Sequence, residues 1–208
     1  MNKRKVETKH AVITIVLAII FWYITFGLKL LNFWYSMGIA ASILATLAMI
    51  FAGKPLKKEE ITLKNILIGV VSAAILYGIF WLGNTLSALM FDFAPHQVGN
   101  IYEIRTQSEL WFITFVLLFI TSPAEEIFWR GFLQRWLEQK NGKTLGWIFG
   151  ALIYGGVHVI SGNFMLTMAA LVAGLFWGYM YQKYETIVPL IISHALWTAT
   201  IFVFFPMM

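Results

Sequence analysis

The feature that most constrains this chain is a series of long runs without charged side chains, separated by short charged segments. Residues 11–28, 30–53 and 65–91 form the first three runs and contain 18, 24 and 27 residues. An α-helix of about 20 apolar residues crosses the roughly 30 Å hydrocarbon core of a bilayer. Each of these runs is therefore expected to be one transmembrane helix.

The second half of the chain continues the pattern. Residues 110–124 form a shorter fourth span, and residues 186–208 form the last one. Residues 144–182 are too long for a single crossing and are expected to turn at Ser161-Gly162-Asn163. The sequence thus predicts an all-α, polytopic membrane bundle of about seven transmembrane helices, with a three-span region in residues 1–107 and a four-span region in residues 108–208.

Composition and charge agree with a membrane protein. The chain is 60% hydrophobic and 12% charged, which a soluble domain of this size would not carry on its surface. With a cytoplasmic N-terminus, only Lys29 and Arg105 of the fifteen basic residues fall outside, as the positive-inside rule requires. The net charge of +5 therefore reflects orientation in a cell membrane, and the expected partner is the lipid bilayer rather than nucleic acid.

Two adjacent carboxylates and an arginine interrupt the apolar pattern after the fourth run. Ser122, Pro123 and Glu125 match a capping box with proline in the first helical turn, so a break or kink at Pro123 is expected. Glu126 and Arg130 are four residues apart and share a helix face, whereas Glu125 is rotated by about 100°. Charged groups at such positions are costly in a membrane and indicate function.

Two histidines, His158 and His194, lie inside later spans. A carboxylate with imidazoles can deprotonate a water, stabilise an oxyanion and protonate a leaving group. Counting about 1.5 Å per residue from the cytoplasmic edges places His158 about 21 Å deep, His194 about 12 Å deep and Glu125 near the edge. Either the fifth span begins after Thr144, or the break at Pro123 carries Glu125 deeper.

Other intramembrane hydrolase chemistries can be tested by the residues that they need, and a serine protease ranks low rather than being absent. A two-aspartate protease needs a second aspartate besides Asp92, and a His-Glu-x-x-His zinc protease needs a motif that is missing here. Ser161 and Ser193 lie near histidines but not in a recognised nucleophile motif. The chain contains no cysteine. Water activated by Glu125, with or without a metal, is the remaining hydrolytic option.

Three ordered motifs in residues 108–205 resemble the CPBP family, the CAAX-processing and bacteriocin-processing membrane endopeptidases also called Abi proteins. The motifs are Glu125-Glu126-x-x-x-Arg130, Tyr154-x-x-x-His158 and His194-x-x-x-Thr198. The resemblance implies that residues 108–208 are a catalytic core. It also implies a peptide or membrane-associated protein as the substrate.

The resemblance also implies roles for these residues. Glu125 and His158 would activate the attacking water, and His194 with Thr198 would polarise the scissile carbonyl. Glu126 and Arg130 would hold the helix. Tyr154 stands where the family usually has phenylalanine, and Thr198 stands where it has asparagine or aspartate.

Several alternatives stay open at the level of sequence. No cofactor is required by a glutamate-type mechanism, but Glu125, His158 and His194 could also hold zinc with an open position. Buried glutamates and histidines could instead relay protons in a transporter or channel-like protein. A catalytically silent family member acting as an immunity or scaffolding protein is the third possibility.

Small residues predict where the later spans pack. Gly146 and Gly150, and then Ala170, Gly174 and Gly178, recur at every fourth position. This spacing lets helix backbones approach closely.

Overall fold

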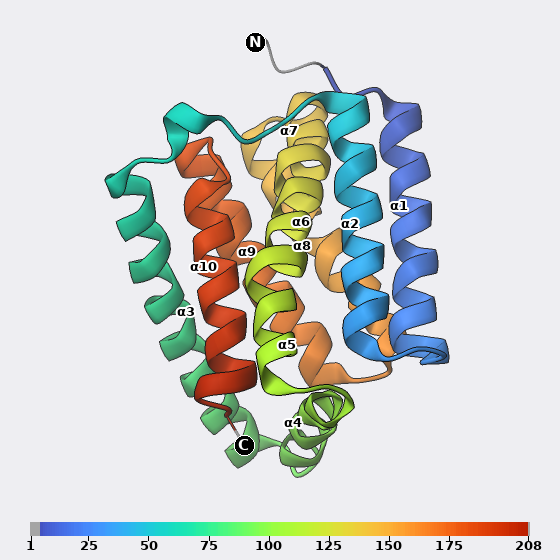
Figure 1. Ribbon diagram of the computed structural model, residues 1–208, viewed down its shortest axis with the longest axis vertical. Coiled ribbons are helices and arrows are strands. Elements are labelled where there is room, and N and C mark those ends of the chain that lie inside the picture. The colour runs from blue at the N-terminus through green and yellow to red at the C-terminus, as the bar shows by residue number, and fades with distance from the viewer. Residues whose placement is uncertain (1–4, 208) are drawn as a thin grey trace.

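The computed structural model describes residues 5–207, in which helices run back and forth between the two ends of a bundle (Figure 1). Six of them are long and apolar enough to cross a membrane, and the shorter apolar helix Val188–Phe204 runs beside them. The protein is therefore a multi-pass helical membrane bundle, as predicted. The helices are α1 (Thr8–Trp22), α2 (Phe33–Ala52), α3 (Leu63–Met90), α4 (Ala94–Tyr102), α5 (Leu110–Val116), α6 (Ser122–Phe128), α7 (Arg135–Asn141), α8 (Lys143–His158), α9 (Phe164–Tyr184) and α10 (Val188–Ala199).

The expected break at Pro123 is wrong. Helices α5, α6 and α7 join into one continuous helix, Leu110–Asn141, through π-helical turns at Leu117–Thr121 and Trp129–Gln134. Ser122 has helical angles (φ −61°, ψ −46°) and caps nothing. A proline inside a helix lacks its N–H and clashes with the carbonyl four residues earlier. The wider π turn directly before Pro123 relieves this conflict without ending the helix.

The continuous helix changes the depth expected for the charged residues. Glu125 is sixteen residues from Asn141, so it lies about 24 Å from that helix end at 1.5 Å per residue. His158 is fifteen residues from the start of α8, or about 22 Å. The two depths now agree, because the fourth span extends well beyond Ala124. The count of basic residues placed Arg130 on the cytoplasmic side of the membrane. In the structure Arg130 is instead buried within the bundle.

The remaining turns follow their sequence signals. Gly162 adopts the left-handed conformation (φ 66°), and the side chain of Asn163 accepts a hydrogen bond from the N–H of Leu166 at the start of α9. This confirms the predicted turn between α8 and α9. Gly142 (φ 80°) forms the tight turn between α7 and α8. Both positions need a positive φ that glycine adopts at little cost.

The glycine spacing marks close contacts between helices. A Cβ added at Gly146 would lie 2.5 Å from the Cα of Glu138, and one at Gly178 would lie 2.6 Å from Cδ1 of Trp147. Only glycine fits at such distances, so α8 packs tightly against both α7 and α9.

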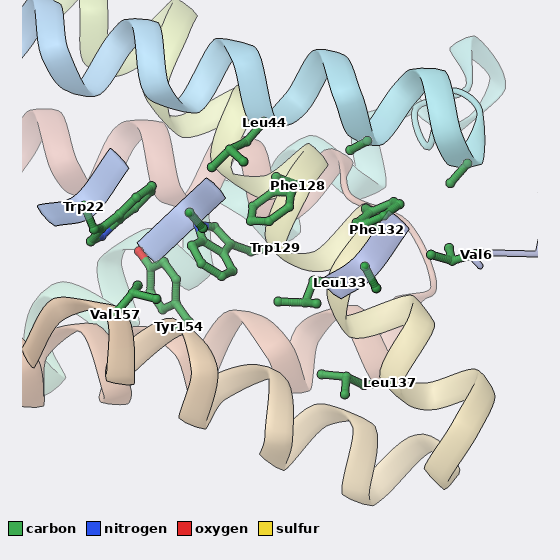
Figure 2. Packing of buried hydrophobic residues seen from close by; sticks show 14 of the residues in the cluster. Val6, Trp22, Leu44, Phe128, Trp129, Phe132, Leu133, Leu137, Tyr154 and Val157 are labelled. Atoms are coloured by element: carbon green, nitrogen blue, oxygen red, sulfur yellow. The ribbon is translucent and has the colours of Figure 1, made fainter. Parts of the chain in front are cut away.

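Large aromatic residues fill the space between α1, α2, α6 and α8. Figure 2 shows Trp22, Phe128, Trp129 and Tyr154 gathered in this cluster. Trp22 and Trp129 meet edge to face with ring centres 5.5 Å apart, and Trp129 meets Tyr154 in the same way at 5.1 Å. The cluster therefore connects the first helix to the Glu-Glu segment and to the helix that carries His158.

Candidate functional site

Glu126 is fully buried, and one of its carboxylate oxygens accepts two hydrogen bonds. Oε1 accepts from Nη1 of Arg130 at 2.9 Å and from Nδ1 of His194 at 2.8 Å. Arg130 lies four residues further along the same helix, as the sequence spacing predicted, and its side chain is 3% exposed. The other oxygen, Oε2, is buried without a hydrogen-bond partner among residues 5–207. Glu126 thus joins the long helix to α10 as well as holding its own turn.

His194 is fixed in orientation by this contact and by an aromatic neighbour. The ring of Trp177, from α9, stacks on the imidazole with centres 4.0 Å apart and planes 18° apart. The indole N–H of Trp177 donates to the hydroxyl of Ser193 at 3.1 Å, which holds the indole in place. Nε2 of His194 makes no hydrogen bond to the described residues. The imidazole is therefore oriented with one nitrogen free.

Glu125 is 6% exposed and points to a different partner. The hydroxyl of Tyr154, on α8, donates to its Oε2 at 3.1 Å. Its Oε1 makes no hydrogen bond to the described residues. The two adjacent glutamates are thus separated in role by their contacts: Glu126 is bound by a cation and an imidazole, whereas Glu125 keeps a free carboxylate oxygen.

His158 has partners on both ring nitrogens. Nδ1 lies 2.8 Å from the carbonyl oxygen of Tyr154, and Nε2 accepts from the indole N–H of Trp22 at 3.2 Å. A carbonyl only accepts and an indole N–H only donates, so His158 is neutral and carries its proton on Nδ1. Its ring is 6% exposed.

Thr198 lies one turn beyond His194 on α10. Its hydroxyl is 2.8 Å from the carbonyl oxygen of His194 and 3.2 Å from the hydroxyl of Ser122. The hydroxyl therefore donates to its own helix, which is the usual partner of a threonine in a helix. Ser122, expected as a helix cap, instead brings a second hydroxyl to this position.

The possible metal ligands Glu125, His158 and His194 do not form a ligand set in this conformation. Within residues 5–207, no three His, Cys, Asp or Glu side chains are placed so that they could hold a metal ion. Trp22 occupies the acceptor nitrogen of His158. Glu125, His158 and His194 are therefore not placed as a zinc site in this conformation.

Two residues that contact the site were missed in the sequence. Trp22 and Trp177 lie on α1 and α9, and each contacts one of the two histidines. An aromatic residue in an apolar span is usually part of the core, so neither position carried a sequence signal. Their contacts depend on how four helices pack together.

The arrangement brings together groups suited to hydrolysis. A buried carboxylate with a free oxygen can take a proton from water, and a buried imidazole with a free nitrogen can bind a polar group of a substrate. Hydroxyl groups from Ser122 and Thr198 adjoin them. These groups come from the long helix and from α10, both in the second half of the chain.

Comparison with known proteins identifies the same half. Residues 107–200 match the model of the family described as Type II CAAX prenyl endopeptidase Rce1-like. The match contains all three motifs and confirms the family resemblance seen in the sequence. No curated protein and no solved structure gives a significant match.

Proposed function

Because residues 107–200 are similar to the Rce1-like type II CAAX prenyl endopeptidases, we propose that this protein is an intramembrane endopeptidase. The observation that carries the proposal is the different bonding of the two adjacent glutamates. Glu126 is neutralised by Arg130 and orients His194, which leaves Glu125 with a free oxygen in a buried setting. Such a carboxylate can act as a general base.

In the proposed reaction the attacking water is bound by Glu125 and His158, and Glu125 takes its proton while the water oxygen forms a bond to the scissile carbonyl carbon. The carbonyl π electrons move to its oxygen and give a tetrahedral oxyanion. When the intermediate collapses, the C–N bond breaks and the proton on Glu125 passes to the leaving amine. The products are a new carboxylate and a new amine, so no oxidant or cofactor is consumed.

His194 is proposed to bind the carbonyl oxygen through its free Nε2. Since Nδ1 already donates to Glu126, Nε2 is a donor only when the ring carries both protons. In the proposed oxyanion complex His194 is the imidazolium, and the carboxylate of Glu126 holds its orientation. Thr198 and Ser122 are proposed to assist through their hydroxyls. The substrate is proposed to be a peptide or membrane-associated protein. In this proposal residues 108–208 form the catalytic core and residues 1–107 add three spans.

The test is peptide cleavage by the purified protein. A quenched peptide library should be cleaved by the wild type, and Glu125→Gln should lower kcat at least about 100-fold, the usual contribution of a general base. Thermal stability in detergent should change little, because Glu125 has only a tyrosine as partner. The matched control is Glu109→Gln, an exposed carboxylate just before the same helix, which should retain full turnover.

Three outcomes would overturn this mechanism. Normal turnover by Glu125→Gln would remove it as the base. A second such outcome is one zinc ion per chain, with activity that is lost on chelation and recovered when zinc is added back. The enzyme would then be metal-dependent. Proton flux in proteoliposomes without peptide cleavage would favour a transporter.

A further inference from the structure

The first helix places one large side chain against the candidate site. The buried face of α1 consists of Ala11, Thr14, Ala18 and Trp22. The first three are small, so Trp22 is the largest fully buried side chain of α1, beside the partly buried Ile15, Leu17 and Phe21. Its indole is 0% exposed and donates to Nε2 of His158. Trp22 lies outside residues 107–200, the part of the chain that matches the family.

This contact consumes the only lone pair that His158 can offer. A neutral imidazole has one donor and one acceptor nitrogen. The carbonyl oxygen of Tyr154 takes the donor, and Trp22 takes the acceptor. A protonated imidazole could not accept the indole N–H at all. While Trp22 is in place, His158 can therefore neither accept a hydrogen bond from water nor take its proton.

The surroundings of His158 offer no second route. Its ring is enclosed edge to face by Trp22, Phe26 and Tyr154, with centres 5.7, 5.5 and 5.1 Å away. Two of these three rings come from the first helix and its extension. Access to His158 is thus controlled from α1.

The chain directly after Trp22 departs from regular α-helical geometry. The helix changes to a π-helical turn at Tyr23–Leu28 and ends at Lys29, which has a positive φ of 51°. Turns of π-helix often accompany functional sites. Trp22 is thus the last fully buried side chain of α1 before the backbone changes geometry.

We propose that Trp22 is a latch on His158. The latch is closed in this structure, and the indole must leave Nε2 before His158 can bind the attacking water beside Glu125. This inference rests on the proposed function, since it describes the regulation of that site. A substrate that displaces α1 or Phe26 would open the latch as it binds.

The first test replaces the indole while keeping an aromatic ring. Trp22→Phe removes the N–H but preserves most of the packing. Loss of one net hydrogen bond should shift the closed-to-open equilibrium and raise kcat about 2- to 10-fold. The matched control is Trp34→Phe, because Trp34 is equally buried and donates its N–H to the carbonyl oxygen of Ile104, away from the site. That variant should leave kcat unchanged.

Unchanged or lowered kcat in folded Trp22→Phe would overturn the latch. An inactive wild type that cleaves no peptide better than Glu125→Gln would instead refute the proposed function, and the two failures are therefore distinguishable. If Trp22→Phe does not fold, the wild-type protein provides the test. The indole ¹⁵N–¹H signal of Trp22 should lose its hydrogen-bonded shift when a non-cleavable peptide binds, and an unchanged shift at saturation would contradict the proposal.

Discussion

At the scale of single residues, Oε1 of Glu126 serves two partners of different kinds. Its ion pair with Arg130 compensates charge in a poorly solvated setting, and its bond to His194 fixes the tautomer of an imidazole. The same oxygen thus contributes to stability and, in the proposed mechanism, to chemistry.

Substitution of Glu126 should separate these contributions. Glu126→Gln leaves the guanidinium of Arg130 without a counter-ion, and breaking such a buried pair lowers the free energy of unfolding by about 3–5 kcal/mol. The folded fraction should also lose about 10- to 100-fold in kcat, as expected when a group that orients an imidazole is removed. Arg130→Ala should destabilise similarly but keep more turnover per folded molecule, since the contact with His194 remains.

Thermal unfolding and kcat per folded molecule measure the two effects. Full turnover per folded molecule in Glu126→Gln would reduce Glu126 to a structural partner of Arg130. The two substitutions combined should be less than additive in stability, because they remove the same pair.

Thr198 stands where the third motif of the family has asparagine or aspartate. Its hydroxyl donates to its own helix, so it must turn away from the carbonyl oxygen of His194 to reach an oxyanion. Thr198→Val should therefore lower kcat by less than the roughly 100-fold that loss of a preorganised donor costs. Thr198→Asn should raise kcat or leave it unchanged, since a carboxamide reaches further.

The control for Thr198 lies on the same helix. The hydroxyl of Thr200 makes the same kind of bond, to the carbonyl oxygen of Leu196, but is exposed. Thr200→Val should leave steady-state cleavage unaffected. Wild-type kcat in Thr198→Val would mean that position 198 takes no part in the chemistry.

At the scale of helices, the two π turns of the long helix, Leu117–Thr121 and Trp129–Gln134, limited which side-chain contacts could be predicted from the sequence. The pairing of Glu126 with Arg130 follows from spacing within one turn and was predicted correctly. The partners of His158 and His194 depend on how each helix is rotated in the bundle, and each π turn changes that rotation. The local sequence predicted that a helix starts at Pro123. Packing on both sides of the long helix instead favours one uninterrupted helix.

Close helix contact at Gly146 gives a prediction on the same scale. A Cβ at Gly146 would meet backbone atoms of Glu138, which cannot move aside without displacing α7. Gly146→Ala should lower the free energy of unfolding by about 1–3 kcal/mol, the usual cost of overpacking. Gly156→Ala on the same helix meets nothing within 4 Å and should stabilise by up to about 1 kcal/mol. Equal melting temperatures for the two variants would contradict the close packing.

At the scale of the whole molecule, the six long apolar helices and the turn at Gly162 followed from the sequence, because uncharged run length and turn residues are local signals. The sequence did not predict all the residues that form the candidate site. Residues from the first helix reach His158, although the family motifs lie entirely in the second half. A contact between residues 136 positions apart leaves no periodic trace in a single sequence.

The last prediction concerns orientation in the membrane. The described chain begins at one end of the bundle and finishes at the other (Figure 1). The segment that joins α2 to α3 carries Lys54, Lys57 and Lys58, and the α7–α8 turn carries Lys140 and Lys143. Both lie at the same end as residue 5, and basic loops remain in the cytoplasm. We therefore expect a cytoplasmic N-terminus and an external C-terminus.

Reporters inserted at Gly142 and Gly162 should report cytoplasm and exterior, respectively, and terminal fusions should differ in the same way. Both terminal reporters on one side would show that the short helix α10 does not cross, which would remove His194 from its place beside Glu126 and with it the site.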